Sequence, residues 1–167
     1  MSKIFKIIKV GDPILHKKTK KVKNFTKIDK FINKLHKTLL EYKALGIASN
    51  QVGIDKSLCI IDIPNYNYEW YEGALLNGNI VKFKDLFPLV LINPEVTLML
   101  ESPITTQNEG CLSIPNKFYS VTRYDHIKVK YQDKHGNNNE LQCRSILSRV
   151  IQHEVDHLNG ILINEKL

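Results

Sequence analysis

The chain has 167 residues, of which 43% are hydrophobic and 25% are charged, a length and composition that predict one globular domain with its own hydrophobic core. Three cysteines without a short-range pairing pattern are inconsistent with a disulfide framework and favour a reducing compartment. No stretch approaches the roughly 20 apolar residues of a membrane span, and the N-terminus lacks a signal-peptide run, so we expect a cytoplasmic protein with no membrane partner.

The formal net charge of +7 comes mostly from lysine. The densest run, KKTKKVK, covers residues 17–23 and could contact nucleic acid. It lacks the interleaved aromatic residues or glycines of a binding surface, and single-sign surface charge alone gives only weak non-specific attraction. We therefore predict a solvated loop here and expect no DNA partner.

The first helix is predicted where apolar residues recur at helical spacing from Ile28 to Tyr42. Thr26 and Asp29 resemble a capping box at its start, and Gly46 is expected to stop it. Residues 46–53 then form a run of small residues, read as a loop. Such a loop lets other atoms approach the backbone closely, which suits either a ligand cleft or a tight packing corner.

The middle of the chain is predicted to form strands. Residues 57–63 read as a buried strand with Cys59 in the core, and residues 64–87 as an inserted excursion with hairpin character. One or two strands follow in residues 88–100. Three further strands are expected at 118–123, 127–132 and 140–143, with a hairpin turn at 133–137. The predicted fold class is α+β, with a mostly antiparallel sheet packed against two main helices.

The second helix, in residues 145–160, carries the most informative motif. Ser145 is the expected N-cap, and Gly160 can take the left-handed conformation that ends a helix. His153 and His157 are four residues apart and project from one face, with Glu154 beside them. This spacing favours a metal site in which the glutamate acts as an acid or base. The alternative is a pair of core histidines satisfied by hydrogen bonds.

A catalytic site of this kind needs a third protein ligand and an open position. Glu165, the only carboxylate after the histidines, is a weak candidate because too few residues remain to build a further helix. Cys111 is the best candidate, since it follows Gly110 and precedes Pro115 in a segment that suits a specially shaped bend. A thiolate with two imidazoles is a recognised catalytic set. An inert cysteine, or a Cys/His nucleophilic pair, are the alternatives.

The chain resembles the peptide deformylase family in three separated motifs. They are ALGIASNQ at residues 44–51, EGCLS at 109–113 and QHEVDH at 152–157. The segments VGDPIL at 10–15 and LINP at 91–94 are also similar to the family, so the resemblance covers nearly the whole chain. The EGCLS and QHEVDH segments match the family pattern in full. The first motif departs from it, because Ala44 replaces a glycine and Ser49 an alanine, which predicts a tighter or more polar cleft rim and leaves substrate preference open.

The resemblance implies a role for each matching residue. Cys111, His153 and His157 would bind one divalent metal ion, usually Fe²⁺, although Ni²⁺, Co²⁺ or Zn²⁺ also suit this ligand set. Glu154 would be the general acid and base. Gln51 and the backbone N–H of Leu112 would stabilise the oxyanion, and Gly46 would contact the substrate backbone.

The resemblance also implies the reaction. Family members remove the formyl group from the N-terminal formylmethionine of newly made proteins, so N-formylmethionyl nascent peptides are the expected partners. The C-terminal helix that some bacterial members use at the ribosome is not expected here, and a transient ribosome contact would need another basic surface. Two other functions stay open: a metallopeptidase with a cysteine ligand, and a structural zinc module that binds RNA and has a closed four-ligand site.

Overall fold

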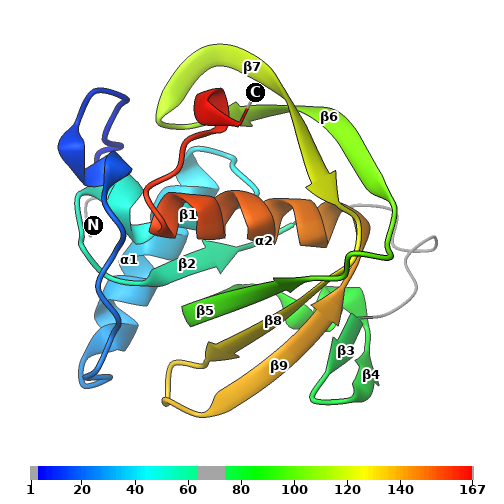
Figure 1. Ribbon diagram of the computed structural model, residues 1–167. Coiled ribbons are helices and arrows are strands. Elements are labelled where there is room, and N and C mark those ends of the chain that lie inside the picture. The colour runs from blue at the N-terminus through cyan, green and yellow to red at the C-terminus, as the bar shows by residue number, and fades with distance from the viewer. Residues whose placement is uncertain (1–3, 64–73, 167) are drawn as a thin grey trace.

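The computed structural model describes residues 4–63 and 74–166. The elements are η1 (Pro13–His16), α1 (Ile28–Glu41), β1 (Gly46–Ala48), η2 (Ser49–Val52), β2 (Leu58–Ile61), β3 (Ala74–Leu76), β4 (Asn79–Val81), η4 (Phe83–Leu86), β5 (Leu89–Leu98), β6 (Ile104–Cys111), β7 (Ile114–Tyr124), β8 (Ile127–Gln132), β9 (Asn138–Cys143), α2 (Ser145–Leu158) and η5 (Ile163–Glu165). The described strands all lie in the chain between helices α1 and α2 and do not alternate with α-helices, which confirms the predicted α+β fold class (Figure 1).

The strands form two separate sheets. Seven of them make one sheet in the order β1-β2-β5-β8-β9-β3-β4, and every neighbouring pair in it is antiparallel. The other two, β6 and β7, form a hairpin that pairs only with itself among the described strands. The hairpin is therefore attached to the rest of the molecule by contacts other than strand pairing and by its chain ends.

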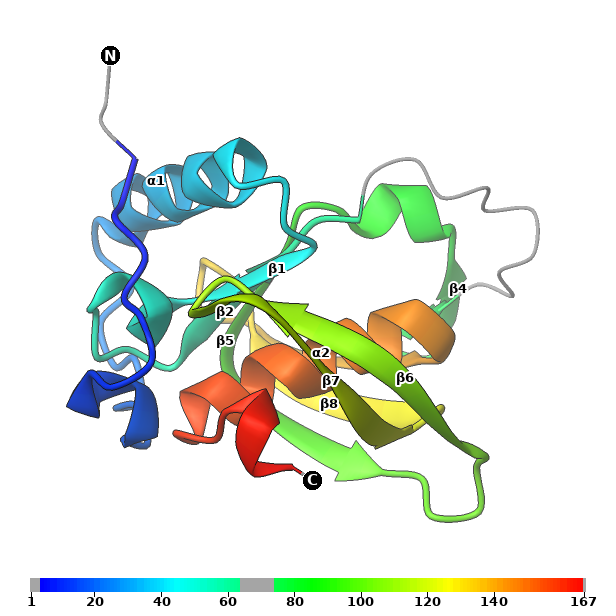
Figure 2. The ribbon, with the colours of Figure 1, turned by 90° about the horizontal axis from the view of Figure 1, so that it is seen from above.

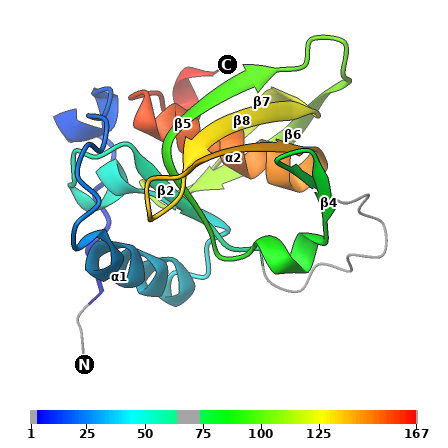
Figure 3. The same cartoon turned by 90° about the horizontal axis from the view of Figure 1, so that it is seen from below.

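Helix α2 lies between the seven-stranded sheet and the β6–β7 hairpin, as the views from the side and from above both show (Figures 1 and 2). Its apolar residues, among them Leu147, Ile151 and Leu158, belong to the core formed with the sheet. From below, strands β5, β8 and β9 run beneath the helix (Figure 3). The opposite face of the helix is thus turned toward the hairpin.

Helix α1 packs near β1 and β2 through a second apolar cluster. Its buried residues Ile32, Leu35 and Leu39 contact residues of β1, β2 and β5 there. The periodic apolar pattern that predicted this helix is confirmed, because those positions are the buried ones.

The predicted helix ends need correction. The N-cap of α1 is Lys27, in a left-handed conformation with φ of 62°, and Thr26 does not cap the helix. In α2 the cap position is Arg144, while Ser145 is the first helical residue. Gly46 does not stop α1 but starts strand β1, because sheet pairing with Ile61 takes over the backbone there. Gly160 does adopt the predicted left-handed conformation, with φ of 76°.

Most predicted strands are confirmed, with Cys59 fully buried in β2 and the turn between β8 and β9 in its expected place. Part of the expected excursion, residues 74–81, is a hairpin of β3 and β4; residues 64–73 lie outside the described part of the chain. Strand β6 was not predicted, since its threonines and Gln107 give no apolar pattern. Residues 46–53 are not a simple loop but contain β1 and η2.

The lysine-rich run at residues 17–23 lies on the surface, as its charge predicted. Lysines between residues 17 and 23 are exposed, while Thr19 and Val22 of the same run are buried, as in a loop that follows the protein surface. Among the residues placed in the structure, no helix is both long and apolar enough to cross a membrane.

Candidate metal centre

Cys111, His153 and His157 come together although two different elements carry them. Their ligand atoms all lie within 4.8 Å of one another, and Cys111 Sγ is 3.2 Å from His157 Nε2. Cys111 ends strand β6, at a register shift next to Gly110, and the histidines lie one turn apart on α2. The described residues thus contain one three-ligand group with the sulfur and imidazole atoms that a divalent transition metal prefers.

Glu154 is buried beside this group but turns toward strand β1. A Cβ placed on Gly46 would lie 2.5 Å from Glu154 Oε1, so only glycine leaves room for the carboxylate. The other oxygen, Oε2, is buried and has no hydrogen-bond partner among the described residues. Burial raises the pKa of Glu154 to about 7. A carboxyl group with this pKa can both accept and release a proton at neutral pH, which suits an acid/base catalyst.

Gln51 extends its amide toward the cysteine from η2. Its Oε1 accepts a hydrogen bond from the Ala48 N–H at 2.9 Å, which turns the Nε2 group toward Cys111 Sγ at 3.6 Å and Ser113 Oγ at 3.3 Å. The side chain is 2% exposed. The amide donor is therefore held at the ligand group by its own loop.

The N-terminal segment joins η2, which carries Gln51, to the β6–β7 turn, which follows Cys111. The Ile8 N–H donates to the Gln51 carbonyl at 2.8 Å, and the Val10 N–H donates to the Ser113 carbonyl at 2.9 Å. Lys9 Nζ donates to the carbonyl of Leu112 at 2.8 Å. Leu112 itself directly follows Cys111 in the turn between β6 and β7. The N-terminal segment thus links the segment that carries Gln51 to the turn that carries Leu112.

Ser49 does not make the cleft rim more polar. It is fully buried, and its hydroxyl donates to the Lys56 carbonyl within the loop. Glu165 also has another use, since it accepts a hydrogen bond from the Leu162 N–H at 2.8 Å and lies 3.1 Å from His16 Nδ1. The expectation of a polar rim is wrong at Ser49, and Glu165 is not in the ligand group.

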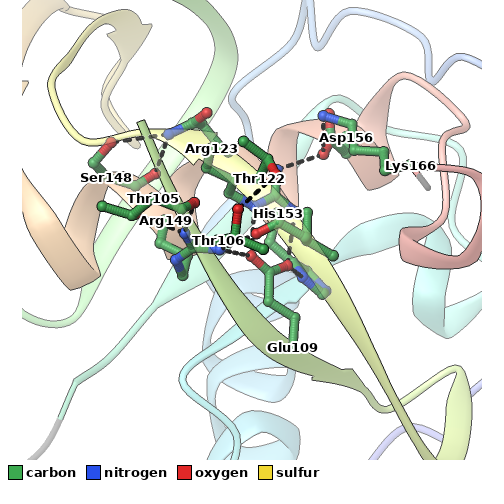
Figure 4. Close-up of polar contacts among 12 residues, drawn as sticks. Thr105, Thr106, Glu109, Thr122, Arg123, Ser148, Arg149, His153, Asp156 and Lys166 are labelled. Atoms are coloured by element: carbon green, nitrogen blue, oxygen red, sulfur yellow. Dashed lines mark hydrogen bonds and ion pairs between the residues drawn. The ribbon is translucent and has the colours of Figure 1, made fainter. Parts of the chain in front are cut away.

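Glu109 has a role that sequence reasoning missed. Its Oε2 is 2.9 Å from His153 Nδ1, and its two oxygens accept hydrogen bonds from Arg123 Nε and Nη2 at 2.6 and 2.8 Å. Arg149 Nη1 also donates to Oε1, at 2.6 Å. Figure 4 shows Arg123, Arg149 and His153 converging on this carboxylate. With Nδ1 donating to Glu109, the neutral form of His153 that a metal ion requires would offer Nε2 as the ligand atom.

The buried groups around the ligand atoms differ in charge. Burial alone would lower the pKa of His153, but hydrogen bonds with Cys111 and Glu109 raise it to about 10, so metal binding would release a proton from this residue. Burial alone would raise the pKa of Glu109, but its hydrogen bonds with Arg123 and His153 hold that pKa well below its usual range, so the residue stays anionic. Burial lowers the pKa of His157 well below its ordinary value, and nearby positive charge on His153 lowers it further. His157 is thus neutral, as a metal ligand must be. Arg149 could have been noticed in the sequence, because it lies four residues before His153 on the same helix face.

The chain is similar to known proteins along almost its whole length. The family model described as Polypeptide deformylase matches residues 4–167. The peptide deformylase of Opitutus terrae is 36% identical over 168 residues, covering 97% of this chain and 84% of the relative. Peptide deformylase 1 of Rickettsia conorii is also 36% identical, over 165 residues that cover 98% of this chain and 87% of the relative.

Solved structures agree with the sequence relatives. The peptide deformylase of Thermotoga maritima superposes with a TM-score of 0.82 at 33% identity, covering 99% of this chain and 98% of that one. The Synechococcus elongatus peptide deformylase, solved in complex with actinonin, also has a TM-score of 0.82, at 30% identity, covering 100% of this chain and 81% of that one. Both likenesses extend over the ligand group and the elements that carry it.

Proposed function

The chain belongs to the polypeptide deformylase family, whose members are metal-dependent enzymes acting on N-formylmethionine, and we propose that Cys111, His153 and His157 hold its catalytic ion. The observation that carries this proposal is the approach of the three ligand atoms to within 4.8 Å, beside a buried carboxylate that is not one of them. A structural zinc module would need a fourth ligand, and the described residues supply three. Fe²⁺ is the proposed resident ion, and Ni²⁺, Co²⁺ and Zn²⁺ suit the same ligands.

The reaction is hydrolysis of the formyl amide. When bound, the ion supplies Lewis-acid activation at the ligand group. Glu154 takes a proton as water attacks the formyl carbon, and it returns that proton to the amine as the carbon–nitrogen bond breaks. Gln51 Nε2 and the Leu112 N–H donate to the formyl oxygen while it carries negative charge. Formate and a free N-terminal amine are the products.

The substrate peptide lies along strand β1 in this proposal. β1 is an edge strand of the seven-stranded sheet, with β2 on one side. An extended peptide can add to such an edge through main-chain hydrogen bonds. Gly46 is the first residue of this strand and touches the Glu154 carboxylate, so a peptide bonded there would present its formyl group to the acid/base residue. N-formylmethionyl nascent peptides are the substrates of this site.

Other parts of the proposal concern the whole protein. We propose that the chain forms a single domain, which is supported by a family match that spans residues 4–167. We propose a cytoplasmic location, where newly made proteins would be processed. Any transient contact with the ribosome would use an exposed basic surface, such as the lysines between residues 17 and 23.

The test is release of formate from formyl-Met peptides by the iron-loaded protein, measured beside digestion of casein. Formate release without casein cleavage is expected, and Cys111→Ala should abolish both formate release and bound metal. Casein cleavage in place of formate release would favour the metallopeptidase. Full metal occupancy in Cys111→Ala, measured by elemental analysis, would remove the thiolate from the ligand set.

A further inference from the structure

The proposed ligands are divided between two elements that share no backbone hydrogen bonds. Cys111 lies on the β6–β7 hairpin, and the histidines lie on α2. A two-stranded hairpin is marginally stable alone, so its position on the helix must be fixed by other contacts. The distance between the sulfur and the imidazoles therefore depends on what binds the hairpin to α2.

Arg149 joins helix α2 to both strands of the hairpin, β6 and β7. From α2, its Nη1 donates to Glu109 Oε1 at 2.6 Å and to the Val121 carbonyl of β7 at 3.1 Å. Its Nη2 donates to both the carbonyl and the hydroxyl of Thr105 in β6, at 2.7 and 2.9 Å. The residue is 7% exposed. One planar guanidinium thus holds both strands of the hairpin to the helix.

Arg149 and His153 also hold the same carboxylate. They are one helical turn apart and contact opposite oxygens of Glu109, Oε1 and Oε2 (Figure 4). Glu109 lies two residues before Cys111 on the same strand. We infer that Arg149 is a positioning residue of the metal centre, which sets the separation of the cysteine and histidine ligands by locking β6 onto α2. This inference rests on the proposed metal-binding role of the three ligands.

The measurement is the affinity of the metal-free full-length protein for Zn²⁺, by competition with a chromophoric chelator. Arg149→Met should bind Zn²⁺ about 10- to 100-fold more weakly, the range typical for residues that orient metal ligands. Arg149→Lys keeps the charge but not the fork of donors, so its loss should be smaller. The thiolate-to-Co²⁺ absorption band of the cobalt form should also shift or weaken in Arg149→Met, because it reports the sulfur position directly.

Two neighbouring threonines provide a matched pair if Arg149→Met does not fold. Thr105→Val removes one acceptor of Arg149 and should lower Zn²⁺ affinity by a few-fold. Thr106 is the next residue on the same strand, but its hydroxyl bonds Thr122 Oγ1 at 2.8 Å instead, so Thr106→Val should leave the affinity unchanged. Thr38→Val in α1 controls for general loss of stability, since its buried hydroxyl bonds the Phe5 N–H and the Lys34 carbonyl.

The outcomes separate the two proposals. Unchanged Zn²⁺ affinity and cobalt spectrum in folded Arg149→Met, or equal affinities of Thr105→Val and Thr106→Val, would overturn the positioning role while leaving the ligand assignment intact. An equal affinity loss in Thr38→Val would overturn it as well, because stability alone would then explain the effect. If the unsubstituted chain binds neither Zn²⁺ nor Co²⁺, the metal site itself fails.

Discussion

The amide of Gln51 gains its direction from a single hydrogen bond. Its oxygen accepts from the Ala48 N–H, so its nitrogen must face Cys111 and Ser113. An amide held in this way needs no reorganisation when negative charge develops on the substrate oxygen. The same hydrogen bonds also stabilise the loop, so a catalytic role and a structural role make different predictions.

We expect Gln51→Ala to lower kcat roughly a hundredfold, equivalent to about 3 kcal/mol, with little change in KM or metal content. The donor is lost where charge develops, and the three metal ligands are untouched. Steady-state kinetics on the folded fraction measure this, with Thr38→Val as the control for stability. A lower unfolding temperature with normal kcat would mean that Gln51 only supports the loop.

Substitutions of Glu154 and Gly46 are expected to lower turnover through the same carboxylate. Glu154→Ala should keep its metal but lose turnover by a factor of about 10² or more, since the acid/base group is gone. Gly46→Ala should also lower kcat, because its Cβ would displace the Glu154 carboxylate. The double variant should be little slower than Glu154→Ala. Additive losses would show that Gly46 acts independently of Glu154, and metal loss in Glu154→Ala would contradict its assignment as a group that does not bind the ion.

At the scale of elements, the β8–β9 turn shows how one side chain fixes a connection. Asp133 Oδ1 accepts hydrogen bonds from the N–H groups of His135 and Asn137, at 2.8 and 2.9 Å. Gly136 completes the turn in a left-handed conformation, with φ of 84°. The turn positions β8 and β9, which form part of the sheet under α2.

Asp133→Ala should lower the free energy of unfolding by about 1 kcal/mol at neutral pH. Burial alone would raise the pKa of Asp133, but hydrogen bonds from Asn137 and His135 lower it below its usual value. A carboxylate with a lowered pKa stabilises the fold above its unfolded pKa, and this contribution is lost as the pH falls through the folded pKa. Denaturant unfolding at pH 7 and in acid checks this, with Asp85→Ala as control. A difference that does not shrink in acid would contradict the ionic contribution.

For the whole molecule, the proposed metal site joins parts that pack around different apolar clusters. The hairpin with Cys111 belongs to a small apolar cluster with Leu15, Leu162 and Ile163, and α2 belongs to the main core. An ion bound by both would act as a cross-link between these clusters. Metal binding should therefore stabilise the protein globally as well as enable catalysis.

Removal of the ion should lower the unfolding temperature, and addition of Zn²⁺ to the metal-free protein should raise it. At free metal about a hundredfold above Kd, binding to the folded state alone adds about 2.7 kcal/mol. Thermal unfolding of the full chain measures this effect. Cys111→Ala should show no rise with Zn²⁺, and an equal rise in that variant would locate the stabilising site elsewhere.

Local signals in the sequence were enough for much of the fold. Helical periodicity predicted both helices, because each buries one apolar face, and alternation with turn residues predicted β8, β9 and the turn between them. Helix starts and strand β6 were not predicted correctly. Lys27 and Arg144 occupy the N-cap positions without a side-chain cap hydrogen bond, so neither follows the usual capping pattern, and β6 exposes most of its side chains.

The sequence was sufficient to propose the ligand residues, since the spacing of His153, Glu154 and His157 on a helix and the motif around Cys111 are both typical of a metal site. Only the tertiary structure decided how these groups are arranged. The approach of Glu154 to Gly46, the position of the Gln51 amide beside Cys111 and the convergence of Arg123 and Arg149 on Glu109 all join residues separated along the chain. Such contacts depend on how α2, the sheet and the hairpin pack together, and no local pattern encodes that packing.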